Sequence, residues 1–99
     1  MSFEDVIRRQ LDLFEEECAD LIAACDAAER AYDAADRDEA EERYGDYLDL
    51  VETGTDRLAE LRDGFASTMD EDAAETYEAE FNRAVRAGLR RFALGIENA

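Results

Sequence analysis

Four arginines near the C-terminus are the residues whose type and spacing most readily suggest a binding function. From position 82 to 96 the chain has no acidic residue, while arginines occur at i, i+3, i+7 and i+8: Arg83, Arg86, Arg90 and Arg91. On one continuous helix this spacing makes a basic stripe. Guanidinium groups bind phosphates and carboxylates, so the stripe is a candidate contact for nucleic acid or an acidic partner. The structural alternative is pairing with acidic neighbours and with the helix dipole.

Catalytic and metal chemistry find little support in the sequence. There is no histidine, which excludes Ser/His/Asp and Cys/His nucleophile systems and the Glu-x-x-His pairs of di-iron bundles. No glycine-rich phosphate loop or dinucleotide fingerprint is present. Asp70-Glu71-Asp72 begins like a calcium loop, but its sixth position is Glu75 instead of glycine. We therefore expect no enzyme activity, no cofactor and no metal site.

Two cysteines, Cys18 and Cys25, lie seven positions apart on one predicted helix. The helical rise separates them by about 10 Å, whereas the Cα atoms of a disulfide lie within about 7 Å. The spacing predicts no disulfide within the chain. Small, buried core residues are the expected role; a bridge across a parallel dimer or a redox role is the alternative.

The length and composition fit one helical domain over residues 1–99. The chain has 99 residues, of which 46% are hydrophobic, so it is not composed like a disordered protein despite a net charge of −17. Eighteen of its residues are alanine. Because small side chains let helices approach closely, we expect close helical packing, above all where alanines follow one another between positions 19 and 35.

The excess of acidic residues also indicates that the protein works at high salt concentration. The 28 acidic residues outnumber 11 basic ones, and every basic residue is arginine. At molar salt the Debye length falls to about 3 Å, so the acidic side chains of such a surface no longer repel one another over long distances. Their carboxylates also keep the surface hydrated. This composition resembles that of haloarchaeal proteins, and the whole chain is similar to a family of small haloarchaeal helical-bundle proteins, which implies a fold but no activity. The alternative is a charge that mimics nucleic acid or recruits a basic partner.

Two apolar seams with four-three spacing predict a helical hairpin. The first seam is Ile7, Leu11, Phe14, Cys18, Leu21, Cys25, Ala28 and Tyr32; the second is Ala40, Tyr44, Tyr47, Val51, Gly54, Leu58, Leu61 and Phe65. A third apolar series runs from Ala74 through Tyr77, Phe81, Ala84, Val85, Gly88 and Phe92 to Ile96. We therefore predict an all-α, antiparallel up-down-up three-helix bundle with long helices at about 3–35, 38–66 and 70–97.

Several local features refine this prediction. Ser2 and Asp70 are placed to cap the first and third helices. The second helix is expected to continue through Gly54, with a break there as the alternative. Ala84 and Gly88, four apart, suggest a close contact along the third helix. The tyrosines near the closed end of the hairpin are expected to be core aromatics with hydroxyls that reach the surface: Tyr32, Tyr44 and Tyr47.

The closed end of the hairpin carries a second resemblance. Its residues are Ala28, Ala31, Ala35, Asp36, Glu39-Ala40, Tyr44 and Tyr47-Leu48. This pattern resembles tetratricopeptide repeats and microtubule-interacting-and-transport domains, although Arg37 stands where those families usually have a glycine and no second repeat is visible. The resemblance implies binding of a partner helix in a groove.

These observations favour a protein-interaction or self-association module over a nucleic-acid-associated protein. Apolar residues left outside the seams favour a homodimer, with a monomer as the alternative: Val6, Leu13, Leu50, Leu89 and Leu94. No stretch approaches the ~20 apolar residues of a membrane span, and the N-terminus lacks the features of a signal peptide. The sequence therefore predicts a cytoplasmic protein that does not enter membranes.

Overall fold

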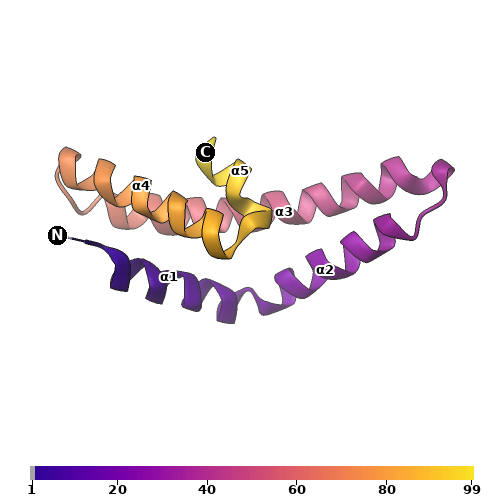
Figure 1. Cartoon of the computed structure of the whole chain (residues 1–99), viewed down its shortest axis with the longest axis horizontal. Coiled ribbons are helices and arrows are strands. Elements are labelled where there is room, and N and C mark those ends of the chain that lie inside the picture. Colours follow the sequence, from indigo (N-terminus) through magenta and orange to yellow (C-terminus); the bar gives the residue numbers. More distant parts are fainter. Residues whose placement is uncertain (1) are drawn as a thin grey trace.

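The computed structural model describes residues 2–99 and confirms the all-α fold class. Its elements are α1 (Glu4–Glu17), α2 (Ala19–Asp33), α3 (Arg37–Ala66), α4 (Glu71–Gly88), the 3₁₀ turn η1 (Arg90–Phe92) and α5 (Ala93–Glu97). Figure 1 shows α1 and α2 along one side of the long α3, with α4 running back beside the C-terminal half of α3. The molecule is elongated, with extents of 51 × 24 × 19 Å.

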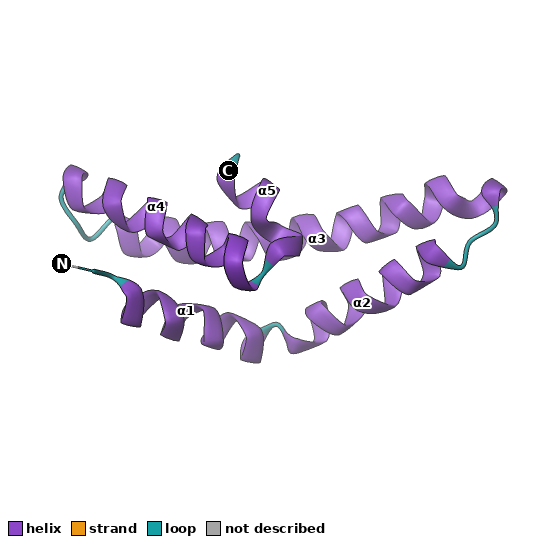
Figure 2. Cartoon of the chain, viewed as in Figure 1, coloured by secondary structure: helices purple, strands orange, loops and turns teal. Residues whose placement is uncertain are grey.

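The first of the three predicted long helices is divided in two. The predicted helix over 3–35 is interrupted at Cys18, whose φ of −109° and ψ of 24° are not helical. Figure 2 shows the resulting bend between α1 and α2. No glycine or proline causes it, and the reason is tertiary packing: α1 contacts α4, whereas α2 packs along α3. A straight helix could not follow both partners.

The second predicted helix is a single element. α3 spans 30 residues without interruption, which confirms that the chain stays helical through Gly54. Gly54 is buried, and a Cβ atom built on it would lie 2.4 Å from Cε1 of the Phe92 ring. The glycine therefore lets an aromatic ring rest directly on the helix backbone.

The third predicted helix, over 70–97, is wrong beyond Gly88. α4 ends there, Leu89 adopts φ −134° and ψ 56°, and the chain turns away as η1 and α5 (Figure 1). Gly88 makes no close interhelical contact, because a Cβ added to it would meet nothing within 4 Å. It instead marks a helix end, where a poor helix former costs little. The turn buries Phe92 and Ile96 at the middle of the molecule.

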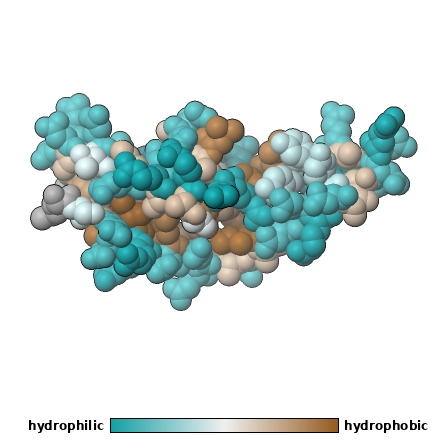
Figure 3. Space-filling view, in the orientation of Figure 1, coloured by the Kyte–Doolittle hydropathy of each residue, from teal (hydrophilic) through white to brown (hydrophobic). Residues whose placement is uncertain are grey.

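Burial divides the molecule into a body and an arm. The body contains α1, α4, η1, α5 and the C-terminal half of α3, and nearly all of the buried hydrophobic residues lie in it. The arm consists of α2 with the N-terminal part of α3, residues 19–50, and Cys25 is its one buried residue. In Figure 3 apolar surface lies mainly over the left half and the centre, whereas the arm on the right is mostly hydrophilic.

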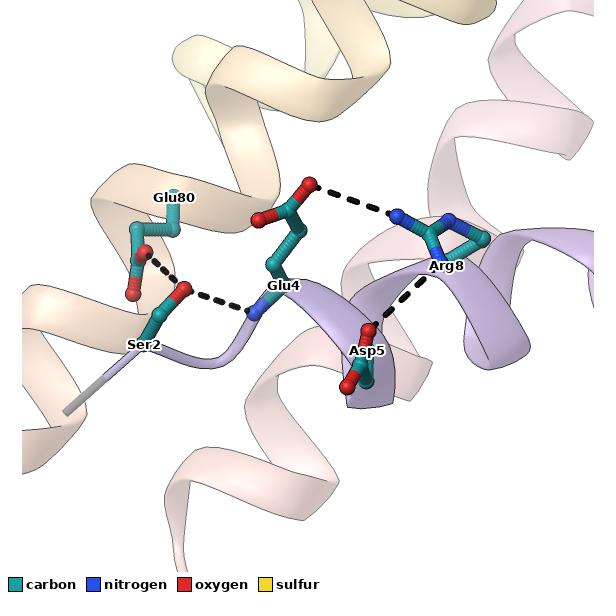
Figure 4. A network of polar contacts seen from close by, with 5 residues as sticks. All are labelled: Ser2, Glu4, Asp5, Arg8 and Glu80. Carbon is teal, nitrogen blue, oxygen red and sulfur yellow. Dashed lines mark hydrogen bonds and ion pairs between the residues drawn. The ribbon is translucent and has the colours of Figure 1, made fainter.

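The two predicted capping residues both contact helix starts. The Asp70 carboxylate accepts a hydrogen bond from the Ala73 backbone N–H at 2.8 Å. The Ser2 hydroxyl accepts one from the Glu4 N–H at 3.1 Å and donates to Glu80 of α4, so it ties the start of α1 to the body (Figure 4). Arg8 lies within ion-pair distance of Glu4 and Asp5 in the same network.

A buried arginine that no sequence pattern distinguishes holds the C-terminal segment. Arg62 of α3 is 5% exposed. Its Nη1 donates to the Ile96 carbonyl at 2.8 Å and to the Asn82 side chain at 3.0 Å, and its Nε donates to Asp63 at 2.8 Å. The Ile96 carbonyl lies in the last turn of α5, where carbonyls lack helical partners. Arg62 thus satisfies a buried group and anchors α5 on α3.

Tyr77 makes the stability of the body depend on pH. Its ring is fully buried against Phe3, Phe65 and Phe81, and its hydroxyl donates to Gln10 Oε1 at 2.7 Å. Burial raises the pKa of Tyr77 to about 12, against 10.0 for an ordinary tyrosine. An unfolded chain therefore loses the Tyr77 proton at a lower pH than the folded one.

We expect the free energy of unfolding to fall as pH rises from about 10 to 12, with a slope of up to about 1.4 kcal/mol per pH unit from this residue. Below pH 10 Tyr77 contributes no slope, since both states hold the proton. Urea unfolding at a series of pH values measures it. The Tyr77→Phe variant is the control and should lack this part of the slope; an identical pH profile in both proteins would contradict the assignment.

Candidate functional site

The structure does not arrange the four predicted arginines as one stripe. Their spacing required a continuous helix, and that helix ends at Gly88. Arg83 and Arg86 lie exposed on α4, and Arg86 pairs with Glu97 of α5. Arg90 is exposed on η1, whereas the side chain of Arg91 is only 19% exposed. The set therefore separates into two α4 residues, one exposed η1 residue and one that packs inward.

Arg91 bridges the two helices of the arm. Its Nη2 lies 3.0 Å from Asp26 and 3.2 Å from Glu29, both on α2. Its Nε donates to the Tyr47 hydroxyl at 3.2 Å, and the guanidinium carbon lies 5.6 Å from the centre of the Tyr47 ring on α3. Burial opposes the charge, but Tyr47 and Asp26 together raise the pKa of Arg91 above its usual value. The guanidinium is thus fully charged and held by two carboxylates and an aromatic ring.

Three tyrosines form a row that begins at Arg91. The ring of Tyr44 stacks on that of Tyr47, with centres 6.4 Å apart and planes 29° apart, and the ring of Tyr32 lies 5.2 Å from that of Tyr44. Because Tyr44 precedes Tyr47 on α3, the row runs from the middle of the molecule toward the turn between α2 and α3. We call Tyr32, Tyr44 and Tyr47 the tyrosine row.

The expectation that these tyrosines are core residues is wrong for two of them. Tyr32 is 39% exposed and Tyr44 is 45% exposed, and Leu48, one turn from Tyr44, is 43% exposed. Tyr47 is half-buried beneath Arg91. The physical reason is that the arm has only two helices, so the aromatic side chains meet each other at the seam but nothing covers them.

The arm that carries this row is strongly acidic. Residues 19–50 hold 11 acidic side chains and three arginines, a net charge of −8. Glu29 and Glu41 each stand three positions before a tyrosine of the row, so they share its helix faces. An apolar and aromatic surface bordered by carboxylates is the result.

An open groove of about 580 Å³ lies in the body between α1 and α4. Its apolar lining residues are Ile7, Leu11, Ala84, Ala87 and Leu89. Its charged lining residues are four carboxylates, Glu4, Asp12, Glu15 and Glu80, and two arginines, Arg8 and Arg83. The groove therefore mixes charges of both signs with acidic residues in excess.

Both cysteines are free thiols in the structure. Cys25 is fully buried, as predicted for a core residue, and burial raises the pKa of its thiol. Cys18 is half-buried at the bend between α1 and α2. A raised pKa lowers the thiolate fraction, which makes Cys25 a poor nucleophile.

Neither a cluster of metal ligands nor a membrane-spanning helix is present in residues 2–99. In this part of the chain no three cysteine, aspartate or glutamate side chains come together as a metal ion would require. None of the helices described there is both long enough and apolar enough to span a membrane.

The comparisons with known proteins add no relative. No protein-family model, curated protein or solved structure matches this chain. The resemblances to haloarchaeal helical bundles and to tetratricopeptide or microtubule-interacting domains therefore stay predictions. What the chain itself offers is an acidic two-helix arm with an uncovered tyrosine row.

Proposed function

We propose that this protein is a non-catalytic interaction module that binds a partner protein through its arm. The observation that carries the proposal is the exposed surface of Tyr32, Tyr44 and Leu48, at the place where the third helical layer is missing. Aromatic side chains supply much of the binding energy at protein interfaces, because they bury large areas at a small entropic cost. The lack of any histidine supports the non-catalytic part of the proposal.

Nucleic-acid association stays the alternative function, but the geometry favours it less. It rested on a basic stripe of four arginines, and two of these have acidic partners inside the chain: Arg86 with Glu97 and Arg91 with Asp26 and Glu29. Arg83 and Arg90 remain as the exposed basic contacts of that alternative. Two separated charges bind a phosphate backbone only weakly.

Other parts of the proposal rest on the sequence. We propose that the protein works in the cytoplasm of a salt-accumulating cell, supported by a net charge of −17 and the complete absence of lysine. Self-association is a further proposal, supported by the exposed Val6 and Leu13 on α1. Sedimentation in molar potassium chloride tests it, since a mass near 11.2 kDa would show a monomer.

A capture experiment with matched variants tests the interaction proposal. The wild type, an arm variant (Tyr44→Ser with Leu48→Ser) and an α1 control (Val6→Ser with Leu13→Ser) are immobilised and exposed to nuclease-treated lysate of the source cells in molar salt. All four residues are exposed, but Tyr44 also packs against Tyr32 and Tyr47, so circular dichroism and urea unfolding first check that each variant keeps the fold of the wild type. We expect proteins retained by the wild type and the α1 control to be lost by the arm variant. Equal capture by all three, or capture that requires nucleic acid, would contradict the proposal.

A further inference from the structure

We propose that the tyrosine row is a recognition site for a basic amphipathic helix of a partner protein, which places arginine or lysine side chains on Tyr44 and apolar side chains on Tyr32 and Leu48. This inference rests on the proposed function, because it names the chemistry of the partner that the arm binds.

The chain already contains one instance of this recognition. Arg91 enters from the third layer, lies against the Tyr47 ring and is held by Asp26 and Glu29. A cation over an aromatic face gains electrostatic attraction, and flanking carboxylates add charge-assisted hydrogen bonds. One end of the tyrosine row therefore binds an arginine within the molecule.

The next position of the row has the same components but lacks the cation. Tyr44 stacks beside Tyr47, is 45% exposed and stands three residues after Glu41. Tyr32 lies against Tyr44, and Glu29, three residues before Tyr32, already pairs with Arg91. A cation on Tyr44 would meet the Tyr44 ring and the nearby Glu41 of α3, whereas both carboxylates that hold Arg91 on Tyr47 come from α2.

A helix is the element that fits this space. α4 forms the third layer over the body, but it ends at Gly88, and the chain then turns onto α3 instead of following the arm. The two helices of the arm consequently present a seam that an added helix can cover, with Leu48 one turn from Tyr44 as an apolar contact.

The negative charge of the arm indicates which kind of partner can cover this seam. The arm has a net charge of −8 and the whole chain −17, so a second copy brings the wrong sign. A basic helix neutralises the carboxylates that border the row, and these close contacts persist in molar salt, where long-range attraction is screened. The observations thus favour a basic partner over self-association through the arm.

Binding of synthetic helical peptides to the full chain tests the inference. Three peptides share a leucine stripe at i, i+3, i+4 and i+7, and their polar positions are arginine, glutamine or glutamate. Titrations are followed by NMR in molar potassium chloride, so that nonspecific attraction to the acidic surface is screened. We expect the arginine peptide to bind most tightly and to shift the amide signals of Tyr32, Tyr44 and Leu48.

Variants of Tyr44 distinguish the contribution of its aromatic ring to peptide binding from the contribution of its apolar surface. Tyr44→Leu keeps an apolar side chain but removes the ring, and should weaken binding of the arginine peptide by about 5- to 30-fold. Tyr44→Phe keeps the ring and should stay within about twofold. Thr76→Ala, at an exposed position of α4 in the body, is the control and should change nothing.

Each other outcome overturns the inference. It fails if the glutamine or glutamate peptide binds as tightly as the arginine peptide, if Tyr44→Leu binds with unchanged affinity, or if no peptide shifts the arm signals. The proposed function is judged separately. Tight binding of the neutral peptide to the arm, lost in the Tyr44→Ser, Leu48→Ser variant, would refute cation recognition and leave the arm as an interaction surface.

Discussion

Replacing Phe92 by alanine is expected to lower the free energy of unfolding by about 3–5 kcal/mol. The ring is 2% exposed, packs edge-on against Phe14 with centres 5.7 Å apart, and rests on the backbone of α3 at Gly54. It thereby joins α1, α3 and the C-terminal segment at one point. Loss of the ring leaves a cavity at the junction of the body and the arm, and a small helical domain cannot fully collapse around it.

Urea unfolding at constant molar salt measures this effect. Leu94→Ala is the matched control, because Leu94 lies two residues further along the same segment and is 74% exposed. We expect the control to change stability by less than about 0.5 kcal/mol. A Phe92→Ala protein as stable as Leu94→Ala would show that the C-terminal segment does not dock as described.

Replacing Gly54 by alanine is expected to destabilise the protein by about 2–3 kcal/mol. In an ordinary helix interior this substitution stabilises by about 1 kcal/mol, because alanine loses less backbone entropy. Here the new Cβ would lie 2.4 Å from Cε1 and 2.9 Å from Cζ of Phe92, a ring that is buried and packed against Phe14 on its other side. Steric strain therefore makes this substitution destabilising, whereas glycine to alanine in a helix interior is ordinarily stabilising.

Gly45→Ala in the same helix is the control for this destabilisation. A Cβ on Gly45 meets no atom within 4 Å, so this variant should gain about 0.5–1 kcal/mol. Phe92→Leu in the Gly54→Ala background should recover part of the loss, since the shorter side chain relieves the overlap. If Gly54→Ala stabilises the protein as Gly45→Ala does, the Phe92 ring does not lie on α3.

The sequence predicted the extent of α3 and the start of α4 well. The apolar spacing stays in phase along α3, which is continuous although it packs on α2 in the arm and on α4 in the body, and the Asp70 cap begins α4 within a residue of the expected position. The prediction failed at Cys18, where the first helix divides. The bend at Cys18 has no local signal, because it follows from α1 and α2 packing against different helices.

Gly88 lies at the end of α4 and not within a longer helix. The spacing of Ala84 and Gly88 suggests a close contact, and the spacing of Phe92 and Ile96 predicts that the helix continues beyond it. The same glycine also weakens a helix, and the turn after it buries both residues against α3. Periodicity alone could not separate a continued helix from one that folds back.

The candidate site depended on that error. On a continuous helix the four arginines would form one surface, whereas the fold pairs Arg91 with Asp26 and Glu29 and leaves the arm uncovered. The tyrosine row could be recognised in the sequence as a cluster, but its exposure could not, because exposure follows from the missing third helix. The acidic residues that flank the row are evident in the sequence, but they indicate a binding surface only once the tyrosines are known to be exposed.

The most direct test of the account is a set of nuclear Overhauser contacts around the C-terminal segment. The folded-back C-terminal segment predicts contacts between the Phe92 ring and the Gly54 Hα protons, and between the Gly95 Hα protons and the Thr55 methyl group, which lies 2.8 Å from the position of a Cβ on Gly95. Helical contacts that continue unbroken across Leu89, with Ile96 against Tyr44 or Leu48, would instead place a third helix over the arm. That result would contradict both the uncovered arm and the partner proposed for it.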